Sequence, residues 1–588
     1  MKWHRPHIRN LPESLRRFGR NDQIVLSLLA AIVGASVAYA VYFFRVLIGA
    51  VQLGAYGFPD EHGVGFFSAL PWWQILFWPT AVGLCVGLLL KYAMPGGRAK
   101  GPADVIEANA LQNAQMPVRE GLLSALISAV SLGAGASAGR EGPVVHLGGS
   151  MAAWLARSFG LSPALSRTIL GCGVAAAVSA SFNAPIAGVF FALEVVLGHY
   201  AIEAFAPIVI SSVIGAIVTR IHLGDFPAFR IDDYIIGSFL ELPAFALLGA
   251  ICAVIAVVFM RSIFIADDGF ERLKIPTWAR PATAGLMVGG IGVFYPHVLG
   301  VGYGATDEAL KELYPLGLLL ILVVAKIAAT AITLGGRFGG GVFSPALYIG
   351  AMVGGAFGLI AATPFPDLAA SSGVYAIVGM GAVASAVLGA PISTILIVFE
   401  LTADYQVVIA VMVGSSVATI VTRALVGKSY FHWQLERRGL ILTHGHLHHV
   451  LQKMQVRDLL SGSCPSVPEN ESIERVRSML DGLSEDQLLV VTDKNRYVGM
   501  IGFRELLIAD AKSGSKLSAK DIANSDPVVL EANTPLERAL SMVEFSAEER
   551  LPVVENLQTL KVLGLVRHAD LLIAYNRALL EDRSVGHK

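Results

Sequence analysis

Two glycine-rich segments of this chain could bind an anion through backbone amides. Residues 133–143 are Gly-Ala-Gly-Ala-Ser-Ala-Gly-Arg-Glu-Gly-Pro, and residues 339–345 are Gly-Gly-Gly-Val-Phe-Ser-Pro. Proline suits the first turn of a helix, where its missing N–H would have no partner. A helix that begins beside glycines exposes its first amides and the positive end of its dipole, and both favour a bound anion. A weaker third segment, residues 96–102, also ends in Gly-Pro.

Glu141 is the titratable residue of the first segment. A carboxylate among glycines in an apolar body is costly, so it predicts a functional role. If amide-rich helix ends bind anions, this carboxylate can occupy the same place as a tethered, competing anion. Protonation would release it and couple anion movement to pH. The alternative is a salt bridge with Arg140, which is disfavoured because adjacent residues of a helix do not face each other.

The composition predicts a membrane body followed by a soluble tail. Only 15% of the 588 residues are charged and 54% are hydrophobic, whereas a soluble protein carries roughly 25% charged residues. Charged side chains are more than twice as dense after residue 450 as before it. The net charge of −1 gives no reason to expect nucleic acid. The four scattered cysteines exclude a disulfide scaffold and show no metal-ligand spacing.

The apolar runs between Ile24 and Leu425 must position the glycine-rich segments. Several are shorter than the roughly 20 residues of a simple span, and glycine and proline interrupt them. Irregular backbone at membrane depth is tolerated only inside protein or along a polar cavity, so broken helices predict a transport pathway. The basic residues before the first run predict a cytoplasmic N-terminus. A charged tail on the same side then requires an even number of crossings.

The membrane part repeats itself. Ala-Pro-Ile precedes a glutamate by the same interval at Glu194 and at Glu400, and Pro143 and Gly148 share their spacing with Pro345 and Gly350. A third match aligns residues 171–175 with 379–383. The matches keep their order, with offsets of about 202 to 208 residues. Two homologous halves with broken segments at equivalent places predict a site at their interface. The alternative is chance similarity among small-residue helix contacts.

Four ordered segments resemble the CLC family of chloride channels and chloride/proton antiporters. They are Gly139–Pro143, Gly340–Pro345, Phe182–Gly188 and Glu400–Gln406. The resemblance covers about residues 20–440 and implies a homodimer in which each subunit has its own pore, built from two inverted halves of broken helices. It implies that Glu141 is the external gating glutamate. It also implies that the amides of Val342 and Phe343 line a central anion site, joined by Gly341, with Gly139, Arg140 and Gly142 around an outer one.

Three positions depart from the family pattern. In the register anchored by residues 105–108, Lys100, beside Gly101, stands where the family has a serine. It could hold the anion, pair with Glu141, lose its charge or extend to the cytoplasmic vestibule. Phe431 stands at the pore-tyrosine position, although a shift of one residue would bring Tyr430 there. Val195 replaces the second glutamate that accepts protons in many family antiporters; Glu203 is nearby but does not align.

The tail resembles a pair of CBS modules. One order of short strands and helices begins at Val456 and recurs from Ala519. Such pairs often bind adenine nucleotides through an acidic residue at the start of the last helix, a position that Asp570 and Glu505 fit. Arg567 and Gly502 stand where the family has Ser or Thr, so a purely structural dimerisation module is the alternative. The histidines at 444–449 lack accompanying cysteines, and no metal site is expected.

The predicted fold is therefore an all-α polytopic membrane protein of the inverted-repeat, broken-helix type followed by an α/β CBS pair. The expected limits are 1–22 for an N-terminal segment, 23–440 for the membrane domain, 441–453 for a linker, and 454–514 and 518–580 for the modules. The halves of the membrane domain are expected at about 23–225 and 235–430.

The resemblance implies chloride transport through a glutamate-gated pore, passive or uncoupled, with proton-coupled antiport as the alternative. A nucleotide-sensing membrane scaffold is the alternative from another class, and no enzymatic activity is expected. The expected partners are a second copy, membrane lipid, small inorganic anions and protons, without nucleic acid. The expected location is the plasma (inner) membrane with both termini cytoplasmic.

Overall fold

The computed structural model describes most of the chain. The described residues are 22–58, 64–200, 202–224, 229, 241–363, 371–402, 405, 407–440, 454–460, 465–482, 487–510, 517–525, 528–543 and 549–587. The basic N-terminal cluster, the histidine-rich connector and part of the fourth motif (Ala403, Asp404 and Gln406) lie outside them. The chain divides into two compact units, residues 1–440 and 441–588, and each is described by itself.

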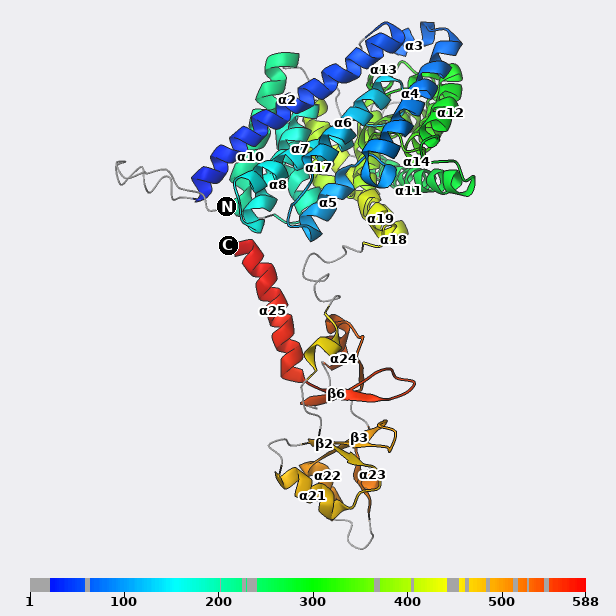
Figure 1. Cartoon of the computed structure of the whole chain (residues 1–588). Coiled ribbons are helices and arrows are strands. Elements are labelled where there is room, and N and C mark those ends of the chain that lie inside the picture. The colour runs from blue at the N-terminus through cyan, green and yellow to red at the C-terminus, as the bar shows by residue number, and fades with distance from the viewer. Residues whose placement is uncertain are drawn as a thin grey trace, which may run out of the picture. The chain divides into compact units, whose positions relative to one another are not determined.

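The first unit consists of helices (Figure 1). Up to the end of the first half they are α2 (Asp22–Tyr56), α3 (Val64–Ala69), α4 (Trp72–Ala93), η1 (Pro95–Gly97), α5 (Pro102–Leu111), α6 (Val118–Gly133), α7 (Glu141–Ser158), α8 (Pro163–Phe182), α9 (Pro185–Phe191), the π-helical η2 (Ala192–Leu197) and α10 (Ile202–Leu223). The remainder are α11 (Leu242–Arg272), α12 (Arg280–Phe294), η4 (Pro296–Val298), α13 (Tyr303–Leu310), α14 (Leu316–Gly335), α15 (Phe343–Ala362), α16 (Ser372–Leu388), α17 (Pro391–Thr402), α18 (Val408–Val426) and α19 (Tyr430–Glu436).

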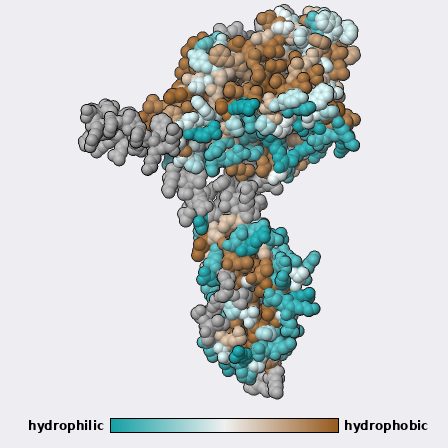
Figure 2. Space-filling view, in the orientation of Figure 1, coloured by the Kyte–Doolittle hydropathy of each residue, from teal (hydrophilic) through white to brown (hydrophobic). Residues whose placement is uncertain are grey.

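Eight helices in the described part of this unit are long and apolar enough to cross a membrane. Among the shorter helices, residues 185–197, α16 and α17 are also apolar. Hydrophobic residues cover much of the visible face of the unit, and a band of hydrophilic residues follows one edge (Figure 2). A hydrocarbon core is about 30 Å thick, which a helix of about 20 residues spans. The structure therefore confirms a multi-pass membrane body in which full-length spans alternate with short helices.

The two halves repeat one packing arrangement. In the first, α8 packs against α7 and α10; in the second, α16 packs against α15 and α18. Each crossing brings two glycines together, because a Cβ on Gly148 would lie 2.4 Å from the Gly173 carbonyl oxygen and one on Gly350 would lie 2.2 Å from that of Gly379. The counterpart of Gly379 is therefore Gly173 and not Gly171, which corrects the sequence alignment by two residues.

The second unit contains two small sheets with the same topology. One comprises β1 (Ser466–Pro468), β2 (Gln487–Val491) and β3 (Tyr497–Gly502); the other comprises β4 (Leu530–Glu531), β5 (Arg550–Val554) and β6 (Val562–Arg567). In each, the first strand runs parallel to the second and the second antiparallel to the third. The helices are η5 (Val456–Leu459), α21 (Ile473–Gly482), α22 (Phe503–Asp510), α23 (Ala519–Ile522), α24 (Leu536–Val543) and α25 (His568–His587).

In the tail, the short segment that precedes each sheet in sequence packs into the core of the other module. Val456 is buried in the core that contains β4 and β5, and Ala519 is buried in the core that contains β1 and β2. The modules also bond directly, since the Tyr497 amide donates to the Leu560 carbonyl at 2.8 Å. The two modules are therefore joined by shared cores and by a direct backbone hydrogen bond.

Candidate functional site

A cavity of about 400 Å³ lies where the two glycine-rich segments meet the last helix of the membrane unit. The N-terminal residues of α7 and α15 line it, and Phe431 of α19 lines it from the second half. It reaches the loop before α5 and the charged residues of α11. Of the residues expected at the anion, the cavity gathers Lys100, Gly101, Glu141, Gly142, Gly341, Val342, Phe343 and Phe431.

Two backbone hydrogen bonds join the glycine-rich segments. The Gly139 amide donates to the Gly341 carbonyl at 2.7 Å, and the Gly341 amide donates to the Gly139 carbonyl at 2.7 Å. The approach needs glycine, because a Cβ on Gly341 would lie 2.9 Å from the Gly142 nitrogen. The two glycines are 202 residues apart and belong to different halves. Their bridge therefore places the N-termini of helices α7 and α15 beside one cavity.

The same bridge corrects part of the expected anion site. The amides of Gly139 and Gly341 are already paired with carbonyls, so they cannot also donate to an ion. The amides at the start of α15, those of Val342 and Phe343, lie before the first helical hydrogen bond and have no partner within the helix. They remain suitable anion donors, together with the Gly142 amide in the first turn of α7.

Arg140 does not face the cavity. Its guanidinium stacks on the ring of Tyr303, with Cζ 4.8 Å from the ring centroid, and Nη2 donates to the Ser181 carbonyl at 3.1 Å. The side chain is buried. The side chain of Arg140 therefore supports the segment that carries Glu141, and the expected place of residue 140 around the anion stays a prediction.

Glu141 is buried in the wall of the cavity and makes two hydrogen bonds through one oxygen. The Tyr303 hydroxyl donates to Oε1 at 3.0 Å, and the Ser344 hydroxyl donates to the same atom. Oε2 is buried and has no hydrogen-bond partner among the described residues. Local sequence patterns did not predict either donor. Ser344 lies inside a quoted motif, but Tyr303 lies between two apolar runs, and no residue near it in sequence links it to Glu141.

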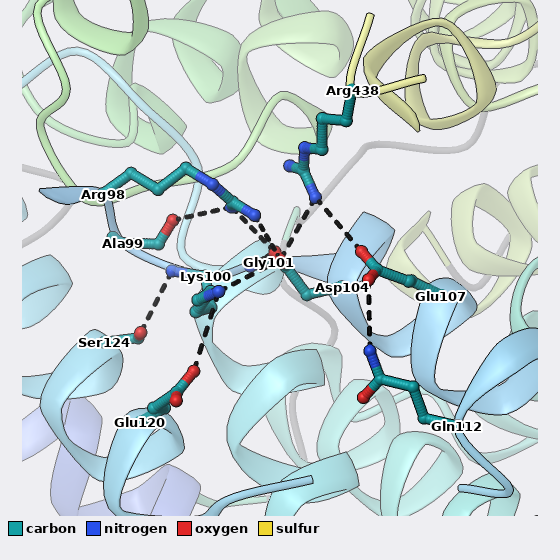
Figure 3. A network of polar contacts seen from close by, with 10 residues as sticks. All are labelled: Arg98, Ala99, Lys100, Gly101, Asp104, Glu107, Gln112, Glu120, Ser124 and Arg438. Atoms are coloured by element: carbon teal, nitrogen blue, oxygen red, sulfur yellow. Dashed lines mark hydrogen bonds and ion pairs between the residues drawn. The ribbon is translucent and has the colours of Figure 1, made fainter. Parts of the chain in front are cut away.

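Lys100 lines the cavity and belongs to a network of charged side chains (Figure 3). Its Nζ lies 3.7 Å from Asp104 Oδ1 and 3.7 Å from Glu120 Oε2, and its amide donates to the Ser124 hydroxyl at 3.0 Å. The ammonium therefore pairs with carboxylates and does not pair with Glu141. Of the alternatives for Lys100, the structure therefore speaks against a pair with Glu141, and the others stay predictions.

Asp104 is the centre of that network. It accepts hydrogen bonds from Arg98 at 2.5 and 3.0 Å, from Arg438 at 3.1 Å and from the Gly101 amide at 2.9 Å. It lies in α5, outside the eight candidate spans. Burial alone would raise the pKa of Asp104, but the hydrogen bond and charge of Arg98 and the charge of Arg438 hold it well below its usual value. Asp104 thus ties the loop that lines the cavity to the end of α19.

The two aromatic residues and Val195 lie differently with respect to the cavity. Phe431 lines the cavity and Tyr430 lies beside it, so the register of the two aromatic residues places both at the cavity wall. Val195 is buried in η2 and does not line the cavity. Glu203 is exposed at the start of α10. Neither position offers a buried carboxyl group beside the cavity.

The paired glutamates of the repeat perform one structural task. Glu194 accepts from the Ile392 amide at 3.3 Å and the Ser393 amide at 2.7 Å, at the start of α17. Glu400 accepts from the Ile186 and Ala187 amides, at 3.0 and 2.7 Å, at the start of α9. Each half thus caps a short helix of the other half, where unpaired amides and the helix dipole favour a carboxylate.

The expected nucleotide residues of the tail have intramolecular partners. Asp570 accepts from Arg567 at 2.9 and 3.0 Å, and Glu505 accepts from the Gly502 amide at 2.9 Å. Each partner stands at the position where the family pattern has Ser or Thr. The parts of the chain that the structure describes contain no group of three or more His, Cys, Asp or Glu side chains suited to a metal ion.

The fold and cavity define a class of protein: a multi-pass membrane transporter whose two repeated halves direct broken-helix N-termini at one shared cavity. A family model described as voltage gated chloride channel matches residues 82–423, and a CBS domain model matches residues 456–512 and 519–577. The chain therefore belongs to the voltage-gated chloride channel (CLC) family of anion transporters and carries a C-terminal CBS pair.

Individual relatives agree with this assignment. The chain is 32% identical over 413 residues to a ClcB-like chloride channel protein of Ralstonia nicotianae, covering 70% of this chain and 96% of the relative. It is 33% identical over 314 residues to the H(+)/Cl(-) exchange transporter ClcA of Vibrio cholerae, covering 52% and 67%. A slow cyanobacterial Cl-/H+ antiporter structure superposes with a TM-score of 0.64 at 24% identity, covering 70% and 97%. A eukaryotic CLC transporter structure superposes with a TM-score of 0.61 at 18% identity, covering 93% and 97%.

Proposed function

We propose that this chain carries chloride through the cavity beneath Glu141, which acts as the gate. The observation that supports this most is the position of the carboxylate, buried beside the N-termini of both α7 and α15. The free amides of Gly142, Val342 and Phe343 and the two helix dipoles supply partial positive charge. A small anion held by partial charges binds weakly enough to leave again, as conduction requires.

The gate works by competition between the carboxylate and the transported anion. An ionised Glu141 occupies the anion position at the outer end of the cavity, and its charge is favoured by the same helix ends that would favour chloride. Protonation removes that charge and allows the side chain to leave. Phe431 narrows the inner end by contact, since a phenyl ring cannot donate a hydrogen bond. Lys100 lines this end, with its charge balanced by Asp104 and Glu120.

The favoured mode is passive or uncoupled flux, because Val195 cannot hold a proton at the inner position. Proton-coupled exchange is the second candidate, and the similarity to the ClcA exchangers favours it. Under exchange, protons would reach Glu141 along the cavity itself.

Reconstitution in liposomes tests the function and separates the two modes. Purified protein should release chloride when a counter-ion shunt is supplied, and empty liposomes should not. With a chloride gradient and an imposed pH gradient, passive flux gives a reversal potential at the chloride equilibrium value. A shift away from that value that follows the pH gradient establishes exchange. Absence of chloride release from protein that remains monodisperse contradicts the proposed function.

We also propose that the chain forms a homodimer in the plasma (inner) membrane, with both termini cytoplasmic and an adenine nucleotide at the CBS pair. The membership of the CLC family and the CBS match support these assignments. A nucleotide at Asp570 would have to displace the Arg567 guanidinium. Titration of the full-length protein with ATP, ADP and AMP, followed by calorimetry, tests that site, and the absence of heat for all three contradicts it.

A further inference from the structure

One carboxylate oxygen of the first half, Oε1 of Glu141, receives hydroxyl groups from two helices of the second half. Tyr303 is the first residue of α13 and Ser344 is the second residue of α15, while Glu141 begins α7. All three side chains are buried, and the two hydroxyl oxygens lie 3.4 Å apart. Neither hydroxyl is part of the amide and dipole system that would hold the transported ion. Their shared acceptor is the group that has to move if Glu141 is the gate.

Hydroxyl donors act differently on the two protonation states of a carboxyl group. A hydrogen bond to an ionised oxygen is roughly twice as strong as one to a neutral oxygen. In a buried site this difference stabilises the ionised, retained form of Glu141 relative to the protonated form. Oε2 has no hydrogen-bond partner among the described residues. Proton uptake can therefore form an O–H bond at Oε2 while both hydroxyls still occupy Oε1.

The Tyr303 ring is held in place before the gate moves. The Arg140 guanidinium lies over the Tyr303 ring, with Cζ 4.8 Å from the ring centroid. The rings of Phe229 and Tyr303 pack edge to face, with their centroids 5.7 Å apart. The loop before it is fixed by the fully buried Lys326, which donates to the carbonyls of Val298 at 3.0 Å and Gly300 at 3.1 Å. The hydroxyl is therefore presented to Glu141 by a rigid support.

The loop also requires a glycine next to the tyrosine. Gly302 has a φ of +93°, and a Cβ there would lie 2.8 Å from the Tyr348 ring and 3.1 Å from Lys326 Nζ. The loop thus passes close to Lys326 only because residue 302 has no side chain.

The geometry points to a hydroxyl latch: Tyr303 and Ser344 are positioning residues that hold the Glu141 carboxylate in its closed place until a proton arrives. This inference rests on the proposed gating role of Glu141 and assigns to it two residues of the closed state. The other groups that bear on Glu141 are Arg140 on its own segment and, from the walls of the same cavity, the charged and phenolic side chains of Arg98, Lys100, Asp267, Glu271, Arg337, Tyr430, Arg437 and Arg438. None of these is changed by the test below.

The test measures chloride flux from liposomes as a function of external pH. The variants Tyr303→Phe and Ser344→Ala each remove one donor and keep the remaining shape. Because the ionised form loses support, protonation becomes easier and the pH of half-maximal flux should rise by about one unit in each variant. The double variant should shift it further. Ser344→Thr keeps a hydroxyl and should retain the parent midpoint.

The matched control is Tyr348→Phe. This residue is a buried tyrosine of α15 whose hydroxyl has no hydrogen-bond partner among the described residues. It should leave the midpoint unchanged, which excludes a general effect of losing a buried phenol. Each variant is first checked for monodispersity in detergent, so that a folding defect is not scored as a gating defect.

Two results separate the latch from the gate on which it rests. If Glu141→Gln abolishes the pH dependence but Tyr303→Phe and Ser344→Ala leave the parent midpoint unmoved, the latch is wrong and the gate stands. If the flux of Glu141→Gln still follows pH as in the parent, the proposed gate itself is wrong. A midpoint that moves to lower pH in Tyr303→Phe also overturns the latch, because it would mean that the hydroxyl stabilises the protonated form.

Discussion

Replacing Asp104 with asparagine should destabilise the membrane unit without changing its shape. Asp104 is the acceptor for both Arg98 and Arg438 and for the Gly101 amide (Figure 3). Asparagine has the same size but keeps one acceptor oxygen, and its NH₂ group faces an arginine that also donates. Arg438 lies 334 residues from Asp104, so the change removes a contact between the start and the end of the unit.

The magnitude follows from the hydrogen bonds that are lost. Asparagine can satisfy about two of the four donors, so roughly two charge-assisted hydrogen bonds disappear, and each contributes about 1.5–3 kcal/mol. The arginine side chains are 29% and 21% exposed, so water replaces part of the loss. We expect the free energy of unfolding to fall by about 2–4 kcal/mol at pH 7.

The stability difference between the parent and Asp104→Asn should depend on pH. The pKa of Asp104 is lowered in the folded protein, so its contribution to stability is present above the unfolded-state pKa of about 4 and is lost as the pH falls below it. Parent and Asp104→Asn should therefore differ most at neutral pH and converge below about pH 4. Thermal unfolding in detergent micelles across this range measures the difference.

The control is Glu107→Gln. Glu107 contacts Arg438 only at 3.8 Å and is 24% exposed, so its loss should cost less than about 1 kcal/mol. Equal stability of Asp104→Asn and the parent at pH 7, or a difference that grows on acidification, would refute the reasoning about Asp104.

Two further predictions concern the helix caps and the inner end of the cavity. Glu400→Gln should lower the free energy of unfolding by about 1–2 kcal/mol, because the α9 amides lose a charged acceptor. The control is Glu203→Gln at an exposed position, which should have no measurable effect in the same unfolding assay. Lys100→Met should leave the relative flux of chloride and nitrate unchanged, because the Lys100 ammonium pairs with Asp104 and Glu120; an altered anion preference would show that the ammonium faces the ion.

Local sequence patterns predicted the parts of the site that depend on short segments. The glycine–proline endings predicted where α7 and α15 begin, and the repeat predicted two halves around one cavity. Glu141 stood out because a lone carboxylate in an apolar body has few structural explanations. The helix starts and Glu141 could be predicted because each depends on residues within about one turn of helix, and the two halves could be predicted because the sequence itself repeats.

The remaining features depend on contacts between distant segments, which no local pattern encodes. The pairing of the Gly139 and Gly341 amides arises only when both halves meet. Tyr303 reaches Glu141 across 162 positions. The partners of Lys100 lie on α5 and α6, and their positions depend on how these helices pack. The two-residue error at Gly171 has the same origin, since the close approach of Gly148 and Gly173 fixes the correct register.

The central claim is that the Glu141 carboxyl group and the anion compete for one place at the meeting of the two helix N-termini. Chloride flux from liposomes that contain Glu141→Gln, measured from pH 4 to pH 8 beside the parent and Glu141→Asp, tests it most directly. The account predicts that flux through Glu141→Gln is constant with pH, while the parent and Glu141→Asp both lose flux as the pH rises. Flux through Glu141→Gln that declines with rising pH as it does in the parent would contradict the account.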